Sequence, residues 1–399
     1  MMMRKRSRFF CLLMVIGVLA ATLMMQASPQ GNTAQAPAAA AGQPQAQPPA
    51  GQEEPQPQPS HDKPAEQVYR NIKVLNGLPS DQVIESMQTF RAALGVECDF
   101  CHVRQNGRLM PPLDDKKEKQ TARQMIIMVN SINATNFNGR LEVTCATCHQ
   151  GQHQPRPFPP VADLEKLKAR LDAEQHPVKR EDLPSADSLF DKYEQAIGGA
   201  AAVAKLTTRV AKATATLPSG ATVQVEAYLK APDRALSIQT TQQGSQWSCF
   251  DGSTAWTLRG RQLQRLEGPE AAQLKLQADF YRDFKLKGRY AQAITVGKEK
   301  VNERDVYVVR GQLANTKFQE TLFFDTQSGL LLRRTTLTRT PFGPVPETQD
   351  FDDYREVSGV KVAYTVKTAR PDNVVVRKLT EISFNTPVDD SKFAPPAQQ

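Results

Sequence analysis

The spacing of apolar residues changes character along the chain. In the first half, apolar side chains recur every three or four residues over residues 80–94 and again over residues 114–132. This is the spacing of one face of an α-helix. Gly95 follows the first run, and glycine is the usual residue just past a helix end. Each of these predicted helices leads, after a short turn, into a cysteine-containing stretch.

From about residue 186 the pattern becomes that of strands. A helix is predicted over residues 186–197, and Gly198 and Gly199 end it. Beyond them, short runs alternate apolar and polar residues, and turns rich in Asp, Asn and Gly separate the runs. Alternation of this kind predicts hairpins of an antiparallel sheet. One further helix is predicted over residues 269–284.

The two cysteine stretches carry the chemistry. Both read C-x-x-C-H, over residues 98–102 and 145–149, and they contain four of the six cysteines and two of the five histidines. This is the attachment sequence of a c-type haem, in which two thiols form thioethers and the histidine ligates the iron. We therefore expect two covalently bound haem c groups. The expected attachment residues are Cys98, Cys101, Cys145 and Cys148, and the expected iron ligands are His102 and His149.

Two other interpretations of the cysteines remain open at this point. A four-cysteine zinc site is one, but 43 residues separate the two cysteine pairs, whereas about 15–20 is usual. Zinc also has no need of a histidine directly after each pair. A disulfide or redox motif is the other, but it expects a βαβ setting that the pattern does not show.

A sixth iron ligand is expected from methionine. The remaining histidines, His61, His153 and His176, lie in Pro- or Gln-rich sequence. The helix predicted before each motif instead carries methionine on its apolar face, and Met/His ligation raises the haem potential. The alternative is that these methionines only fill a core, which is a common use of methionine.

The N-terminus predicts export. Residues 1–27 have a basic start, an apolar run and a small-residue end, as in a signal peptide. An uncleaved anchor is the alternative, since the apolar run is just long enough to span a bilayer. Residues 28–64 are rich in Pro, Gln and Ala and predict a disordered linker. We expect a periplasmic protein, either soluble or tethered to the inner membrane.

The charge excludes one class of partner. The formal net charge is +8, and four basic residues at the extreme N-terminus supply half of it, so that cleavage would leave +4. The sequence shows no basic cluster interleaved with aromatic residues. We therefore expect no nucleic acid partner.

Residues about 66–160 resemble the cytochrome c subunit of photosynthetic bacterial reaction centres. The resemblance rests on residues 87–96 before the first motif and on residues 121–128 with 143–145 before the second. It implies that Met87 and Met125 are the sixth ligands, with Met128 the second choice for the latter. Well-known members carry four haems whereas this chain has two motifs, and Gln150 stands where arginine often follows.

The second half weakly resembles the half-barrel of periplasmic lipoprotein-localisation factors, over residues about 186–395. That resemblance implies a concave face able to hold an acyl chain or another apolar ligand. The alternative is a filled sheet core used for docking. Histidine is absent after His176, which removes His-based triads and most metal sites. Cys249, between bulky neighbours, is expected to be a buried structural thiol.

Together these patterns predict an α+β multidomain protein, with an all-α dihaem cytochrome c domain followed by an antiparallel β half-barrel. Its expected function is one-electron transfer between a redox donor and an acceptor, and not catalysis. A haem enzyme with an open iron site is one alternative. A redox-input sensor or lipid-handling protein that works through its β domain is another. The expected divisions are residues 1–27, 28–64, 65–160, 161–185 and 186–399.

Overall fold

The structure is a computed structural model. It describes residues 63–155, 167–168, 171, 180–242, 244–314, 316, 318–371 and 373–396. The predicted export signal, nearly all of the linker and most of the expected division at 161–185 lie outside these residues. No helix in the described ranges is long and apolar enough to cross a membrane.

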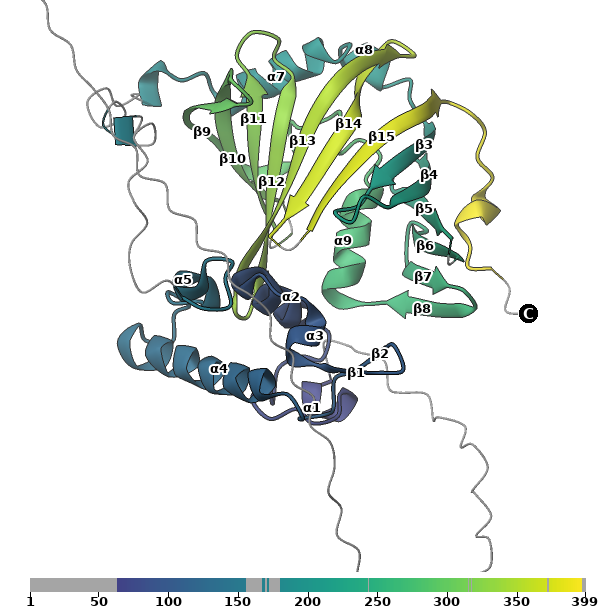
Figure 1. The fold of residues 1–399 in the computed structure, drawn as a ribbon. Helices are drawn as coiled ribbons and strands as arrows, with labels where there is room; N and C mark the ends of the chain where they lie inside the picture. The colour runs from purple at the N-terminus through teal and green to yellow at the C-terminus, as the bar shows by residue number, and fades with distance from the viewer. Residues whose placement is uncertain are drawn as a thin grey trace, which may run out of the picture. The chain divides into compact units, whose positions relative to one another are not determined.

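The N-terminal part of the described chain is a small helical assembly that carries both cysteine motifs (Figure 1). The first predicted helix is α2 and the second is α4; each motif forms a short helix of its own, α3 and α5. Helix α2 contacts α5, and α3 contacts α4. The elements are α1 (Ala65–Val68), α2 (Gln82–Leu94), α3 (Cys98–Cys101), β1 (Val103–Gln105), β2 (Arg108–Met110), α4 (Lys117–Asn136) and α5 (Cys145–His149).

The strands β1 and β2 correct the prediction of an all-α haem region. They form a two-stranded antiparallel sheet directly after the first motif. The turn between them is Asn106-Gly107, and both residues have positive φ, 50° and 77°. Asn-Gly is the preferred pair for a two-residue hairpin turn. This pair is a local hairpin signal in the sequence, and the helical periodicity on either side of it points to a different structure.

Gly95 ends α2 and also allows a close backbone approach. Its φ is 65°, in the left-handed region, and its N–H donates to the Arg91 carbonyl. A Cβ atom at this position would lie 2.1 Å from the carbonyl oxygen of Gly151. The Gly151 N–H in turn donates to the Ala93 carbonyl at 2.8 Å. The end of α2 therefore packs directly against the loop that follows the second motif.

The C-terminal part is built on one thirteen-stranded sheet in which every neighbouring pair is antiparallel, as predicted. Its order is β8-β7-β6-β5-β4-β3-β15-β14-β13-β12-β11-β10-β9. The final strand β15 therefore pairs with the first strand β3. The strands are β3 (Thr208–Thr216), β4 (Thr222–Lys230), β5 (Arg234–Thr241), β6 (Gly244–Phe250), β7 (Ala255–Arg259), β8 (Gln262–Leu266), β9 (Tyr290–Val301), β10 (Arg304–Leu313), β11 (Gln319–Asp325), β12 (Leu331–Thr340), β13 (Gly343–Val357), β14 (Val360–Arg370) and β15 (Asn373–Phe384).

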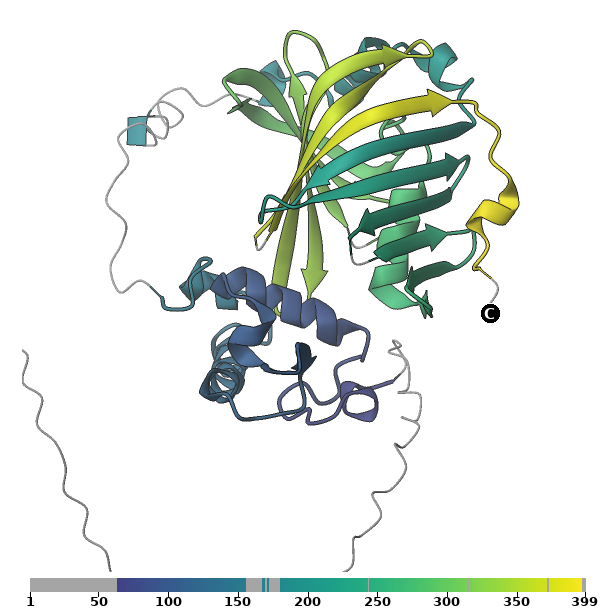
Figure 2. The ribbon, with the colours of Figure 1, turned by 45° about the vertical axis from the view of Figure 1, so that its right-hand side comes forward.

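The sheet is strongly curved, and three α-helices pack on the same face, here called the inner face (Figure 2). These helices are α7 (Ala186–Ala196), α8 (Ala200–Val203) and α9 (Gly268–Ala278). Helix α9 ends six residues before the predicted end at 284. Phe190 lies in α7 and Ile197 is its C-cap residue. Both pack with Leu322 and Phe324 of β11 in the largest buried apolar cluster of the described residues. Much of the inner face is therefore filled by the chain's own side chains.

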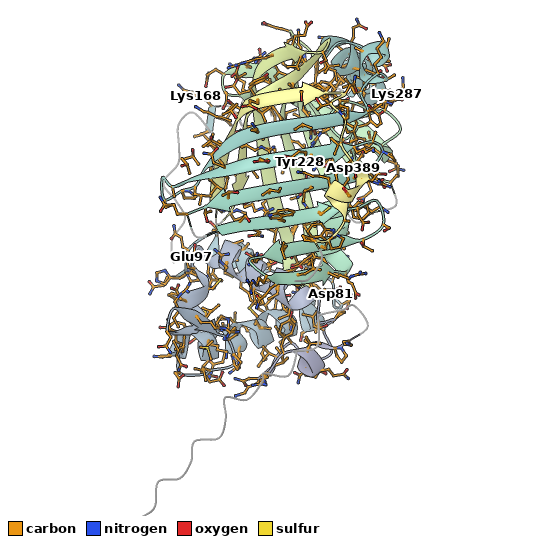
Figure 3. All side chains as sticks on the ribbon, turned by 90° about the vertical axis from the view of Figure 1, so that its right-hand side faces the viewer. Asp81, Glu97, Lys168, Tyr228, Lys287 and Asp389 are labelled. Atoms are coloured by element: carbon orange, nitrogen blue, oxygen red, sulfur yellow. The ribbon has the colours of Figure 1, made fainter. Side chains whose placement is uncertain are left out.

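The C-terminal segment covers part of the opposite, outer face. Phe393 in the short 3₁₀ helix η2 (Asp390–Phe393) is 1% exposed and packs with Trp256 and Cys249. Its carbonyl accepts hydrogen bonds from the Trp256 indole at 3.1 Å and the Cys249 thiol at 3.3 Å. Figure 3 labels Tyr228 and Asp389 where this segment crosses the sheet, and the ammonium of Lys392 in η2 lies 4.3 Å from the centroid of the Tyr228 ring. Cys249 is the buried thiol that was predicted.

Candidate haem sites

In the first motif, both cysteines lie in the single helical turn of α3. Cys98 and Cys101 are three residues apart, and residues at this spacing share a helix face. His102 follows as the C-cap, and its N–H donates to the Cys98 carbonyl at 3.0 Å. Burial raises the pKa of the Cys101 thiol, with Glu118 acting in the same direction. The turn therefore presents two thiols on one side and an imidazole at its end.

The second motif repeats this arrangement in α5. Thr144 and Thr147 form a capping box in which each side chain bonds the other's backbone N–H, which stabilises a helix of only five residues. Cys145 and Cys148 again lie three residues apart, and burial raises the pKa of Cys145. Gln150 continues the chain in the left-handed region at φ 50°. His149 is the last residue of the helix.

The environment of His149 leaves one ring nitrogen free for iron. Its Nδ1 lies 2.9 Å from the Gln152 carbonyl oxygen. A carbonyl only accepts hydrogen bonds, so Nδ1 carries the proton and Nε2 keeps its lone pair. A backbone carbonyl on the far nitrogen is a common way to orient a metal-binding histidine. This residue therefore fits the role of an iron ligand.

His102 is held differently. Its Nδ1 is buried and has no hydrogen-bond partner among the described residues. Burial lowers the pKa of His102, Lys119 adds to this, and the nearby Pro111 carbonyl acts in the opposite direction. The imidazole is therefore kept neutral, which is the form that binds iron.

A cluster of charges lies beside the first motif. Lys119 is 8% exposed, and its ammonium donates to the carbonyls of Pro111 and Leu113 at 2.7 Å each. Asp114 accepts from Lys119 at 2.8 Å and from Arg123 at 2.9 Å. These contacts hold the pKa of Asp114 far below its usual range. They also attach the loop after β2 to helix α4.

Asn133 of α4 positions the segment before the second motif, a role that periodicity did not reveal. It is 5% exposed, its amide donates to the Val143 carbonyl at 2.7 Å, and its Oδ1 accepts the Val143 N–H at 2.9 Å and the Glu142 N–H at 3.1 Å. One side chain thus satisfies three backbone groups. A polar residue on the buried face of a predicted helix was the available signal.

The predicted methionine ligands lie in unlike surroundings. Met87 of α2 is half-buried and packs against the apolar cluster of Val83, Ile126 and Phe342. Met125 and Met128 of α4 are 36% and 43% exposed, whereas Ile126 beside them is buried. Met125 and Met128 therefore do not fill this core. Which thioether serves as a sixth ligand stays a prediction.

The arrangement of the cysteines bears on the alternatives. All five cysteines in the described ranges are free thiols. In the same ranges no group of three or more Cys, His, Asp or Glu side chains is placed to hold a metal ion. The four motif thiols are therefore not gathered around one point, as a four-cysteine zinc site would require. Each motif instead offers two thiols and one imidazole, the donor set of a c-type haem.

Paired thiols in a helical turn, followed by an imidazole with a free nitrogen, define a c-type cytochrome. The comparisons with known proteins agree. Residues 21–224, just over half of the chain, match the family model of the photosynthetic reaction centre cytochrome C subunit. The chain belongs to this family, which implies covalently bound haem c and electron transfer.

The family relatives match over a limited length. The photosynthetic reaction center cytochrome c subunit of Roseobacter denitrificans is 32% identical over 98 residues, which cover 23% of this chain and 26% of the relative. That of Rubrivivax gelatinosus is 30% identical over 96 residues, 23% of this chain and 25% of the relative. The chain thus spans about a quarter of these relatives.

Solved structures resemble the β-rich part at low similarity. A DUF1329 family protein from Desulfovibrio piger has a TM-score of 0.40 and 14% identity, and covers 53% of this chain and 98% of its own. A LolA superfamily protein from Nitrosomonas europaea has a TM-score of 0.39 and 14% identity, covering 53% and 99%. Likeness at this level says nothing about a ligand or a role.

Proposed function

We propose that this chain is an exported dihaem c-type cytochrome that carries single electrons between protein partners. The observation that carries the proposal is the repeated geometry of α3 and α5. Each helix holds two cysteines three residues apart and ends in a histidine. A helix that bears methionine precedes each motif along the chain.

The roles of the residues follow from their chemistry. Cys98 and Cys101 hold the first haem through thioether bonds, and Cys145 and Cys148 hold the second. His102 and His149 offer Nε2 to the iron, and Met87 and Met125 offer sulfur from the other side. Bound haem c supplies a ferric–ferrous couple. If these residues held the iron in this way, no coordination position would be left for a substrate, and the bound group would serve electron transfer and not catalysis.

The location and the partners belong to the same proposal. Haem c is attached outside the bacterial cytoplasm, so we infer a periplasmic protein, soluble or held at the inner membrane by residues 1–27. The donor and the acceptor are redox proteins. The match covers about a quarter of the length of each reaction-centre cytochrome subunit and supports a shared electron-transfer module. A reaction centre as partner is not part of the proposal.

For the β domain we propose docking or the binding of an apolar ligand. The large cluster beneath α7 fills much of the inner face, which favours docking. A cavity of about 280 Å³ lies between the start of α7 and β9, just under the range of about 300–1,000 Å³ typical of ligand pockets. A redox-input sensor or a lipid-handling protein, with the β domain as the working part, is the alternative function.

Haem attachment is the direct test. We expect full-length protein matured in a host that attaches haem c to stain for haem on a denaturing gel and to gain the mass of two haems. Replacing Cys98 and Cys101 by alanine, or Cys145 and Cys148, should each remove one haem. The matched control, Cys249→Ala, should keep both. A denatured protein with no haem and no added mass would overturn the proposal.

Axial ligation separates a carrier from a haem enzyme. We expect the ferric protein to show the far-red sulfur-to-iron charge-transfer band that marks methionine ligation, with an intensity for two haems. We also expect carbon monoxide not to bind the ferrous protein readily. Rapid binding by one haem would show an open iron site and would favour the enzyme alternative.

A further inference from the structure

Two arginines, Arg209 on β3 and Arg377 on β15, lie on the inner face of the sheet. Arg209 pairs in register with Leu229 and Phe384, which belong to the buried cluster beneath α7. Arg377 pairs with Ala215, which is six residues from Arg209 on the same strand. Because side chains alternate between the faces of a sheet with a period of two, Arg209, Ala215 and Arg377 share the inner face.

The other buried charges on this face are paired. Arg334 donates to Asp283 at 2.7 Å, and Arg282 donates to Glu320 at 3.2 Å. The Tyr290 hydroxyl also donates to Glu320 at 2.7 Å. Burial alone would raise the pKa of Glu320, but Arg334 and Arg282 hold it below its ordinary value. These two cations and two carboxylates balance one another.

Arg209 and Arg377 have no such partners. Within the described part of the chain, neither forms an ion pair or a side-chain hydrogen bond. Asp283 raises the pKa of both, but its carboxylate is bound to Arg334. Glu347 also influences Arg377, but it pairs with Arg370. Burial lowers the pKa of both arginines. The inner face therefore carries two positive charges that have no ion-pair partner in the described part of the chain.

Solvent can reach these charges. Arg209 is half-buried and Arg377 is exposed, although the surrounding protein is dense enough to disfavour the charged form of each. A side chain that lines a concave surface is both accessible to solvent and surrounded by much protein. Arg377 also lowers the pKa of Arg209 through charge repulsion, as expected for two guanidinium groups that lie in one region of the inner face.

An apolar strip continues from the arginines along the same face. From Arg209 to Ala215, the partner of Arg377, the inner-face positions of β3 after the arginine are all alanines, at 211, 213 and 215. The strip extends onto neighbouring strands as a cluster separate from the one beneath α7. It comprises Ala213, Ala215, Val223 and Val225, with Leu217, Val375 and Leu379 partly buried against them.

We propose that the inner face binds an anionic amphiphile with one apolar chain, whose carboxylate or phosphate is held by Arg209 and Arg377 while the chain lies along this strip. The guanidinium fork matches both anionic groups, with two parallel hydrogen bonds. The proposal gives a chemical class to the apolar ligand proposed for the β domain and rests on that part of the function. It does not depend on the haems.

The test compares probes of equal chain length. We expect isothermal titration of the full-length, haem-loaded protein to show that dodecanoate binds at least tenfold more tightly than dodecanol. Arg377→Gln and Arg209→Gln should each weaken dodecanoate at least tenfold and leave dodecanol unchanged. The matched control is Lys378→Gln, which removes a neighbouring charge from the opposite face of β15 and should change dodecanoate affinity less than twofold.

The outcomes separate the possibilities. Equal dodecanoate affinity in wild type and Arg377→Gln, or no dodecanoate binding, would overturn the proposal, and the exposed Arg377 decides this even if the Arg209 variant fails to fold. Inorganic phosphate binding as tightly as dodecyl phosphate would show a site for free anions only and would also overturn it. A protein that lacks haem but binds dodecanoate would refute the electron-carrier proposal alone.

Discussion

At the scale of single residues, the two haem motifs differ mainly in what surrounds the histidine. His149 donates from Nδ1 to a backbone carbonyl, whereas the Nδ1 of His102 is buried without a partner among the described residues and cations lie nearby. The motif itself is identical in both. The local backbone, and not the pentapeptide, therefore sets the electronic environment of each ligand.

Met125 is the residue whose role is most open to test. Met125→Leu should remove about half of the far-red charge-transfer absorbance, because one of the two haems loses its sulfur ligand. Met128→Leu, three residues along the same exposed stretch of α4, should leave the band intact. The ferric absorption spectrum measures both. The reverse result would make Met128 the ligand.

Asn133 should contribute to stability well beyond an average polar residue. Asn133→Ala leaves the Val143 carbonyl and the N–H groups of Glu142 and Val143 without their partner. The expected loss in the free energy of unfolding is about 2 kcal/mol, since water replaces these bonds only in part. Urea unfolding measures it. Asn130→Ala, on the exposed side of α4, should cost less than about 0.5 kcal/mol.

At the scale of elements, the helices are determined largely by local sequence, and their ends are determined by contacts. Helix α2 ends at Gly95 as predicted, because a left-handed residue was needed there and glycine supplies it. Helix α9 ends at Ala278 and not at 284. Beyond it, Phe280 and Phe284 turn into the cluster beneath α7, so burial of these rings overrides the helical pattern.

Gly95→Ala should be more damaging than an ordinary glycine replacement. The left-handed φ alone costs about 1 kcal/mol, and the new Cβ would also meet the Gly151 carbonyl oxygen at 2.1 Å. We expect a total loss above about 2 kcal/mol in thermal or urea unfolding. Gly139→Ala has a similar φ of 75° and no atom within 4 Å, so it should show only the first cost. Equal losses would contradict the close approach.

Glu85 of helix α2 should make the free energy of unfolding depend on pH. Burial raises the pKa of Glu85 from 4.5 to about 7, with Asp81 of the same helix and Glu270 of α9 adding to it. A carboxyl group whose pKa is raised by folding favours the folded state when protonated. Stability should therefore fall as the pH rises from about 4.5 to about 7 and then level off, by about 1–2 kcal/mol after allowance for solvent screening.

Substitution isolates this effect. Glu85→Gln should remove the decline, so that the difference in unfolding free energy between variant and wild type grows between pH 5 and pH 8. Glu142→Gln, an exposed carboxylate, should leave the pH profile of wild type unchanged. Parallel profiles for wild type and Glu85→Gln would show that Glu85 titrates as a solvated group.

At the scale of the whole molecule, the described helical and sheet parts share contacts, because α2 contacts β12 and β13. Phe342, in the turn between β12 and β13, is 7% exposed and belongs to the cluster formed by Ala65, Leu75, Val83 and Ile126. Its ring meets that of Phe90 edge-on, with 4.9 Å between centroids. Thr340 also bonds Thr89 at 2.8 Å.

Phe342→Ala should therefore destabilise the haem-bearing part although the residue lies about 200 positions from the second motif. Removing a buried phenylalanine typically costs about 3–5 kcal/mol. We expect earlier loss of the haem spectrum during urea unfolding, followed by absorbance. Pro344→Ala, an exposed neighbour in the same hairpin, should have little effect. Haem loss unchanged in Phe342→Ala would show that the two parts unfold independently.

The sequence alone identified the chemistry and the class of each half. The motifs at 98–102 and 145–149 indicate haem c because covalent attachment requires this spacing of the two thiols. The alternation of apolar and polar residues predicted the antiparallel sheet because one face of each strand is buried. The antiparallel pairing is confirmed, the all-α haem region is wrong in its hairpin at 103–110, and the domain boundaries and haem ligands stay predictions.

The tertiary structure decided which residues far apart in the chain pair with one another. Periodicity cannot show that β15 pairs with β3, that Phe342 completes a core near the N-terminus, or that Arg209 and Arg377 share a face of the sheet. Local pattern reports which side of an element is buried, because that depends on the spacing of its own residues. Which other element covers that side depends on contacts between segments far apart in the chain, and only the folded molecule determines those contacts.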